Sequence, residues 1–170
     1  MSWRISLRPA LVAALALAAS GLAGCGFTPL YATPGVSSGL SSVDVIAPDG
    51  RTGYLIREHL DDALAKKRGT PAAYRMNLQL SEQRFPRGLR VDNVATRYEY
   101  VLTAYYSLVD LSTGSEARRG KVRVQLSYDS ADQPYASIAA QQDVADRAAE
   151  EAARRIQLEL GAWLATKAKG

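Results

Sequence analysis

The sequence predicts an α+β fold, a two-layer sandwich in which two helices pack on one face of a mainly antiparallel four-stranded sheet. Three runs with apolar residues at every second position predict strands that are buried on one face only. Two other runs have apolar residues three and four positions apart, which is typical of helices with one apolar side. The predicted order is β-α-β-β-β-α, and elements that are apolar on one side bury that side by stacking in two layers.

The first strand and the first helix are expected between residues 43 and 68. Residues 43–46 predict a short strand, and Pro48-Asp49-Gly50 is typical of the turn that ends it. From Tyr54 to about Arg68 the apolar spacing becomes helical, and Gly69-Thr70-Pro71 predicts the end of this helix. Its apolar side consists of Ile56, Leu60, Ala63 and Leu64.

Three alternating strands follow the helix. Their apolar positions are even-numbered and lie within residues 74–80, 94–108 and 122–128. The segments "RFPRGLRVDN" and "DLSTGSEARRG" link them, so the sequence predicts an antiparallel meander with a loop at each link. The second of these runs is longer than an ordinary strand, which predicts a bulge or a free end that projects past the sheet.

A long helix is expected from about Ser137 to Lys167. Acidic residues lie toward its start and basic residues later, an order that favours the helix dipole. Glu150 and Glu151 each precede an arginine by four positions, Arg154 and Arg155, and these pairs are expected to interact. The apolar stripe consists of Val144, Ala145, Ala148, Ala152, Ile156, Leu160 and Trp163.

The N-terminal region has the pattern of a secretory signal peptide. Arg4 and Arg8 precede the apolar run 11–19, which is too short to span a membrane. We expect residues 1–24 to be removed. Because residues 25–42 are rich in Gly, Ser, Thr and Pro, they are expected to form a lipidated N-terminus and flexible tether, before a single domain at 43–168.

Leu22-Ala23-Gly24-Cys25 resembles the lipobox of bacterial lipoproteins at all four positions. The resemblance implies that Cys25 carries an S-diacylglycerol and an N-acyl group, and two or more chains anchor a protein stably. Gly26 stands where an Asp would favour the inner membrane, so the resemblance implies the outer membrane. The alternative is an ordinary secreted protein with an incidental thiol. Cys25 is the only cysteine, so no disulfide and no cofactor beyond this covalent lipid is expected.

The segment "CGFTPLY" and the layout of the body together resemble a known family. With the strand "ATRYEYVLTAYYSLVD" and the final helix "QQDVADRAAEEAARRIQLELGAWLA", they are similar to LptE, the lipopolysaccharide-assembly lipoproteins. The resemblance implies a non-enzymatic protein that forms a heterodimer with the outer-membrane β-barrel LptD and plugs its lumen from the periplasmic side. It also implies a role in barrel assembly and in binding and inserting lipopolysaccharide.

The residues themselves offer little for catalysis. His59 is the only histidine, and there is no second cysteine to complete a transition-metal site, so we expect no metal. Asp61 and Asp62 are adjacent on a predicted helix, as are Glu150 and Glu151 on another. The two carboxylates of each pair therefore cannot face each other across a cleft. Removing Arg4 and Arg8 lowers the net charge of +4 by two, so we expect no nucleic-acid partner.

Two basic clusters are the candidate lipopolysaccharide-binding sites, because the arginine fork suits phosphate. Successive turns of a meander lie at opposite ends of the sheet, so the clusters are expected to form two sites; the alternative is that each is an ordinary solvated hairpin end. Phe85 and Leu89 add apolar groups to the first cluster, which is therefore the preferred site of the two. Tyr105 breaks the even-numbered pattern, and it joins Phe85 and Leu89 as a candidate barrel contact. The first cluster is Arg84, Arg87, Arg90 and Arg97, and the second is Arg118, Arg119, Lys121 and Arg123.

A second class of function remains open. A periplasm-facing adaptor or envelope-stabilising lipoprotein that binds another protein or peptidoglycan fits the same anchor and fold. It is favoured if neutralising the basic clusters leaves lipopolysaccharide binding unchanged. A lipid-anchored hydrolase needs a nucleophile and base pair that the sequence does not display.

Overall fold

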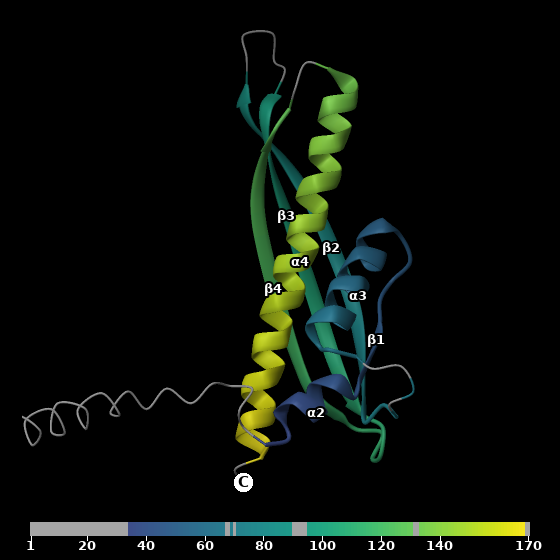
Figure 1. Cartoon of the computed structure of the whole chain (residues 1–170). Helices are drawn as coiled ribbons and strands as arrows, with labels where there is room; N and C mark the ends of the chain where they lie inside the picture. Colours follow the sequence, from purple (N-terminus) through teal and green to yellow (C-terminus); the bar gives the residue numbers. More distant parts are fainter. Residues whose placement is uncertain (1–33, 67–68, 70, 90–94, 131–132, 169–170) are drawn as a thin grey trace, which may run out of the picture.

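A computed structural model describes residues 34–66, 69, 71–89, 95–130 and 133–168 of the chain. It confirms the predicted α+β sandwich: a four-stranded sheet with its helices on one face (Figure 1). The described elements are, in order, α2 (Val36–Ser41), β1 (Val43–Ile46), α3 (Arg51–Ala63), β2 (Tyr74–Leu89), β3 (Ala95–Asp110), β4 (Glu116–Asp129) and α4 (Pro134–Lys167).

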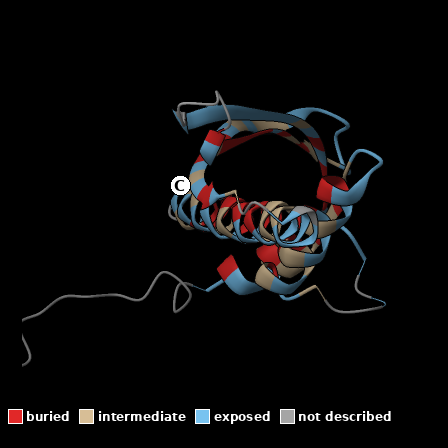
Figure 2. Ribbon diagram, turned by 90° about the horizontal axis from the view of Figure 1, so that it is seen from above, coloured by how far each residue is buried: buried red, intermediate tan, exposed pale blue. Residues whose placement is uncertain are grey.

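The sheet has the strand order β1-β2-β3-β4. The short β1 runs parallel to β2 and pairs only with Tyr74–Asn77, whereas the other pairs are antiparallel. From above, the sheet forms an arch over the helical layer (Figure 2). Even-numbered residues of β2, β3 and β4 face the helices, as the alternation predicts.

The core lies between the sheet and the helices. Alanines on the buried side of α4, among them Ala148 and Ala152, are fully buried and allow this helix to approach its neighbours closely. Burying each large apolar side chain stabilises the fold by about 1.5–3 kcal/mol. The largest side chains with almost no exposure include Leu40, Ile56, Leu60, Met76, Leu102, Leu108, Ile156 and Leu160.

Helix α3 begins at Arg51 and ends at Ala63, so the predicted span from Tyr54 to about Arg68 is wrong at both ends. The early end has a local cause. Ala65 takes a left-handed conformation (φ 52°), and its N–H donates to the carbonyl of Asp62 while the N–H of Lys66 donates to that of Asp61. These two bonds satisfy the last carbonyls of the helix, which therefore ends before residues 69–71.

Strands β2 and β4 are longer than predicted. β2 extends through Leu89 and β4 begins at Glu116, so much of both predicted hairpin loops is strand. The β3–β4 register shifts between Leu108 and Val109, but the extra residue is Ala117 of β4, so the predicted bulge in the long strand itself is wrong. The distal part of β3 is paired on both sides, by β2 and β4, and does not project as a free end.

A third helix stands where the sequence predicts the last part of the tether. α2 buries Val36 and Leu40, and Gly39 lies against Leu164 of α4. The segment before Ser42 is therefore packed on the body from Val36 onward, because its two large apolar residues lie on one side of a helical turn. The signal peptide, the lipobox and the earlier part of the tether lie outside the described residues.

Candidate functional site

The first basic cluster is divided between the two faces of the sheet. Arg84 lies on the helix side, where its Nη1 donates to Oε1 of Gln141 in α4 at 2.8 Å. Arg87 and Arg97 lie on the outer face, opposite each other on β2 and β3. Arg90 and the side chain of Leu89 are outside the described part of the chain. The cluster lies on paired strands rather than in a loop, which corrects the prediction.

Ion pairs within the chain neutralise the outer part of this cluster. Nη2 of Arg87 lies 3.0 Å from Oε2 of Glu99, and Nε of Arg97 lies 2.8 Å from Oδ1 of Asp129. The bond to Asp129 raises the pKa of Arg97. Phe85 is 38% exposed beside the guanidinium of Arg87. A phosphate at this site has to compete with two carboxylates.

The second cluster lies along edge strand β4 rather than at a turn. Arg118 is on the helix side, and its Nε donates to the hydroxyl of Tyr106 at 3.4 Å. Arg119 lies on the outer face, and its Nε is 2.6 Å from Oε1 of Glu116. The cluster extends from near the β3–β4 turn to mid-sheet and does not merge with the first, so the expectation of two separate groups is confirmed.

In the second cluster, Lys121 and Arg123 are the residues whose positive charges are not neutralised by a carboxylate of the described chain. Nζ of Lys121 lies 5.2 Å from the ring centroid of Tyr105, a cation–π distance. Among the described residues, neither Lys121 nor Arg123 has a carboxylate within ion-pair distance. Tyr105 is 43% exposed on the outer face, whereas Tyr98 and Tyr100 lie on the helix face, as the parity predicts.

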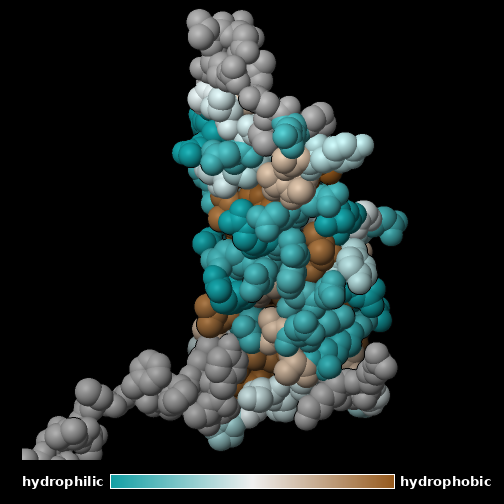
Figure 3. All heavy atoms as spheres, turned by 45° about the horizontal axis from the view of Figure 1, so that its top comes forward, coloured by the Kyte–Doolittle hydropathy of each residue, from teal (hydrophilic) through white to brown (hydrophobic). Residues whose placement is uncertain are grey.

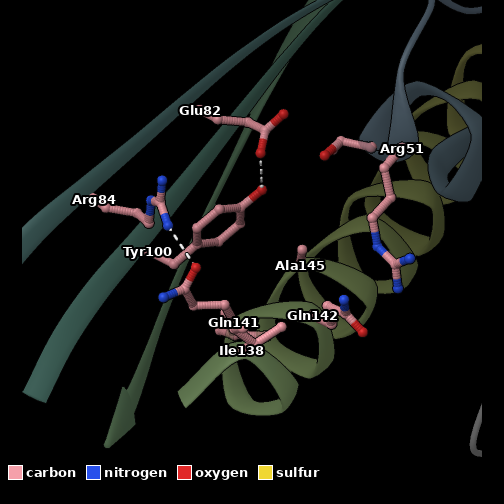
Figure 4. Close-up of a pocket in the computed structure, with 10 residues that line it drawn as sticks. Arg51, Glu82, Arg84, Tyr100, Ile138, Gln141, Gln142 and Ala145 are labelled. Atoms are coloured by element: carbon pink, nitrogen blue, oxygen red, sulfur yellow. Dashed lines mark hydrogen bonds between the residues drawn. The ribbon is translucent and has the colours of Figure 1, made fainter. Parts of the chain in front are cut away.

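A pocket of about 380 Å³ lies between distal β2 and the first turns of α3 and α4 (Figure 4). The hydroxyl of Tyr100 donates to Oε2 of Glu82 at 2.6 Å. Burial, followed by this bond, raises the pKa of Tyr100. Arg84 lies on one side of the pocket and Arg51 on the other, with Ile138 at the rim. No local sequence pattern marks this pocket, because its residues come from four elements distant in sequence.

Other features of the described residues have structural roles. Nε2 of His59 lies 2.8 Å from Oδ1 of Asp146 and connects α3 to α4. Within the described ranges, no cluster of three or more His, Cys, Asp or Glu side chains could hold a metal, and no helix is long and apolar enough to cross a membrane. On the face seen in Figure 3, hydrophilic residues predominate and hydrophobic ones form separate patches.

A family model described as lipopolysaccharide-assembly, LptE, matches residues 40–160. The chain belongs to the LptE family. LptE proteins are non-enzymatic lipoproteins, and the match agrees with the resemblance seen in the sequence. No curated protein matches the chain.

Solved structures from three organisms share the LptE fold with this chain. A candidate lipoprotein of Caulobacter crescentus CB15 is 57% identical over 78% of this chain and 97% of its own, with a TM-score of 0.68. Rare lipoprotein B of Shewanella oneidensis is 18% identical over 71% of this chain and 92% of its own, with a TM-score of 0.54. Lipoprotein B of Nitrosomonas europaea is 16% identical over 71% of this chain and 82% of its own, also with a TM-score of 0.54. The last two likenesses show the fold alone.

Proposed function

We propose that this LptE-family protein is an outer-membrane lipoprotein that forms a heterodimer with the barrel LptD and plugs its lumen from the periplasmic side. In this position it assists the assembly of the barrel and the insertion of lipopolysaccharide. The family match over residues 40–160 is the observation that carries the proposal. Acylation of Cys25 would hold the body at the membrane where the barrel folds and so raise its local concentration.

The outer face of the sheet supports the role of a plug. The interior of an outer-membrane barrel is polar, so a protein that fills it needs side chains that hydrogen-bond without a large apolar patch. Amide and hydroxyl groups suit this purpose, since they both donate and accept. Accessible outer-face residues of this kind include Asn77, Gln79, Gln83 and Ser107.

Lipopolysaccharide carries phosphate groups, and Lys121 and Arg123 are the best-placed residues to meet them. Their charges are not taken up by carboxylates of the described chain, unlike those of Arg87 and Arg97. A charge-assisted hydrogen bond contributes about 1.5–3 kcal/mol, so its loss corresponds to about tenfold or more in affinity.

The phosphate assignment is tested by two matched double variants. Lys121→Gln with Arg123→Gln is expected to weaken binding of purified lipopolysaccharide about tenfold. Arg87→Gln with Arg97→Gln removes the same number of charges and is expected to have a smaller effect. Equal binding by both variants and the unchanged protein would contradict this assignment and favour the adaptor function.

The first experiment for the complex is affinity purification of the tagged, acylated protein from its own outer membrane in mild detergent. Mass spectrometry then identifies whatever remains bound. Stoichiometric recovery of a large β-barrel is the expected result. Recovery of the lipoprotein alone, or with a cell-wall or soluble partner, would overturn the proposal.

A further inference from the structure

The distal half of β2 has an edge that no strand of the described chain covers. β1 pairs with Tyr74–Asn77 and ends there, while β2 continues to Leu89 with β3 on its other side. Figure 1 shows β2 continuing past α3 toward the end of the sheet where α4 begins. An uncovered strand edge presents unpaired N–H and C=O groups, which are a template for another strand.

Backbone hydrogen bonds identify the residues whose polar groups point to this edge. The N–H of Tyr74 donates to the carbonyl of Ser42, on the β1 side, whereas the carbonyl of Ala73 accepts from Leu111, on the β3 side. The β2–β3 register has no shift, so even-numbered residues of β2 keep pointing toward the β1 side. The N–H and C=O groups of Leu80, Glu82 and Arg84 therefore face the open edge.

The position of Pro86 is consistent with this direction of the backbone groups, and it marks one end of the open stretch of β2. It is even-numbered, so the N–H that proline lacks would have faced the edge, which is where sheets tolerate proline. Ile46, the last residue of β1, lies opposite Asn77 and closes the other end. The open stretch is thus centred on Leu80, Glu82 and Arg84, long enough for a short added strand.

The opposite edge of the sheet is protected. Nη1 of Arg155 in α4 donates to the carbonyl of Arg123 in β4 at 2.8 Å, so a side chain already occupies an outward acceptor of that edge. The described β2 edge has no such cap on Leu80, Glu82 or Arg84.

The pocket beside β2 gives the open edge a chemical preference. Glu82 and Arg84 line it together with Arg51 and Ile138. Arg84 donates to a neutral amide, and Arg51 has no ion pair among the described residues. The carboxylate of Glu82 accepts a hydrogen bond from the neutral phenol of Tyr100 and keeps its charge, so the three charged side chains that line the pocket have a net charge of +1. An added strand places alternate side chains on this side of the sheet, where the two guanidinium groups favour an acidic one.

We infer that the β2 edge at Leu80–Arg84 is a strand-addition site for an extended segment of the barrel partner, with an acidic side chain directed into the pocket. The inference rests on the proposed function and names the surface that the complex uses. Main-chain hydrogen bonds give such an interaction its affinity, and the pocket for alternate side chains gives its specificity.

The backbone contribution is tested by comparing Glu82→Pro with Glu82→Ala. Both remove the carboxylate, but only Glu82→Pro removes the edge N–H and places a ring there. Because Glu82→Pro loses the bond from this N–H and its ring also blocks the approach of an added strand, it is expected to recover about tenfold less barrel than Glu82→Ala. Gln125→Pro, at the same level on β4 with its N–H at the protected edge, is the matched control and recovers the barrel normally.

Hydrogen exchange at single-residue resolution provides the second readout. In the complex, the amides of Leu80, Glu82 and Arg84 are expected to exchange at least tenfold more slowly than in the free protein, whereas those of Ser81 and Gln83 bond to β3 in both states. If no barrel is recovered with the unchanged protein, the proposed function fails, and this inference with it. If the barrel is recovered but the three amides exchange as before, or the two Glu82 variants recover equal amounts, only the inference is overturned.

Discussion

Replacing Gly120 with alanine is a direct test of how the sheet is packed. Gly120 lies opposite Tyr106, on the helix face. A Cβ built on Gly120 would lie 2.3 Å from Cζ and 2.4 Å from the hydroxyl oxygen of Tyr106. The ring is 2% exposed, and its hydroxyl donates to Oε2 of Glu159 in α4 at 2.6 Å. The added methyl group therefore has to displace a buried ring that is held at its far end.

The expected cost follows from three contributions. Overpacking a core position costs about 1–3 kcal/mol, and weakening a hydrogen bond to a carboxylate costs up to about 1.5–3 kcal/mol. Removing glycine from a strand gains about 0.5–1 kcal/mol of backbone entropy. The net destabilisation is about 2–4 kcal/mol, which corresponds to a decrease in Tm of roughly 5–15 °C for a domain of this size.

Urea unfolding of the mature chain with Cys25→Ser, which has no thiol to acylate, measures this cost. A double-mutant cycle with Tyr106→Ala isolates the contact. In the Tyr106→Ala background, Gly120→Ala is expected to be neutral or stabilising by about 0.5–1 kcal/mol, because only the entropy term remains. The same large cost in both backgrounds, or no cost beside the intact tyrosine, would refute the reasoning.

Three further changes test local features. Ala65→Gly is expected to raise the free energy of unfolding by about 1 kcal/mol in urea titrations, because Ala65 has a positive φ that glycine adopts freely; a decrease would contradict this. The hydrogen bond from Lys66 lowers the pKa of Asp44, so stability from this pair is present above the ordinary aspartate pKa and is lost as pH falls through the lowered value; Lys66→Met should flatten the acid side of the stability curve below about pH 4. Burial, then the bond to Glu159, raises the pKa of Tyr106, so its neutral form contributes stability that is lost only as pH rises above about 10; because Tyr100 also ionises late, the ultraviolet titration of Tyr106→Phe should show one late-ionising phenol fewer than that of the unchanged protein, and an unchanged titration would rule this out.

Alternation in the sequence predicted the sheet well and its strand ends poorly. Pro86 and Gly88 have the chemistry of a loop, so the local sequence predicts a loop at "RFPRGLRVDN". In the structure β2 continues through both residues, because the N–H that Pro86 lacks falls at the open edge, where it costs no ladder bond. Whether the nitrogen of a proline points toward a paired strand or toward an open edge depends on the register in which the strand pairs. Tertiary contacts determine that register.

The basic clusters could be located from the sequence, but the availability of their charges could not. Arg118 and Arg119 are neighbours in the chain, yet strand alternation places them on opposite faces. Glu99 neutralises Arg87 only because the strands pair in a particular register. The strand register therefore decides which basic residues form ion pairs and which keep an unpaired charge. Local sequence patterns do not specify this register.

The difference between the two sheet edges has a simple topological origin. α4 follows β4 and packs back along it, so Arg155 can reach the carbonyl of Arg123. The chain leaves β1 after Ile46 to form α3, and no side chain of the described residues caps the β2 edge beyond it. The residues proposed to meet phosphate, Lys121 and Arg123, and the edge proposed to accept a strand are consequently on opposite sides of one rigid sheet. Because β3 lies between the two sites and no interaction of the described residues joins them, substitutions at one are expected to leave binding at the other unchanged.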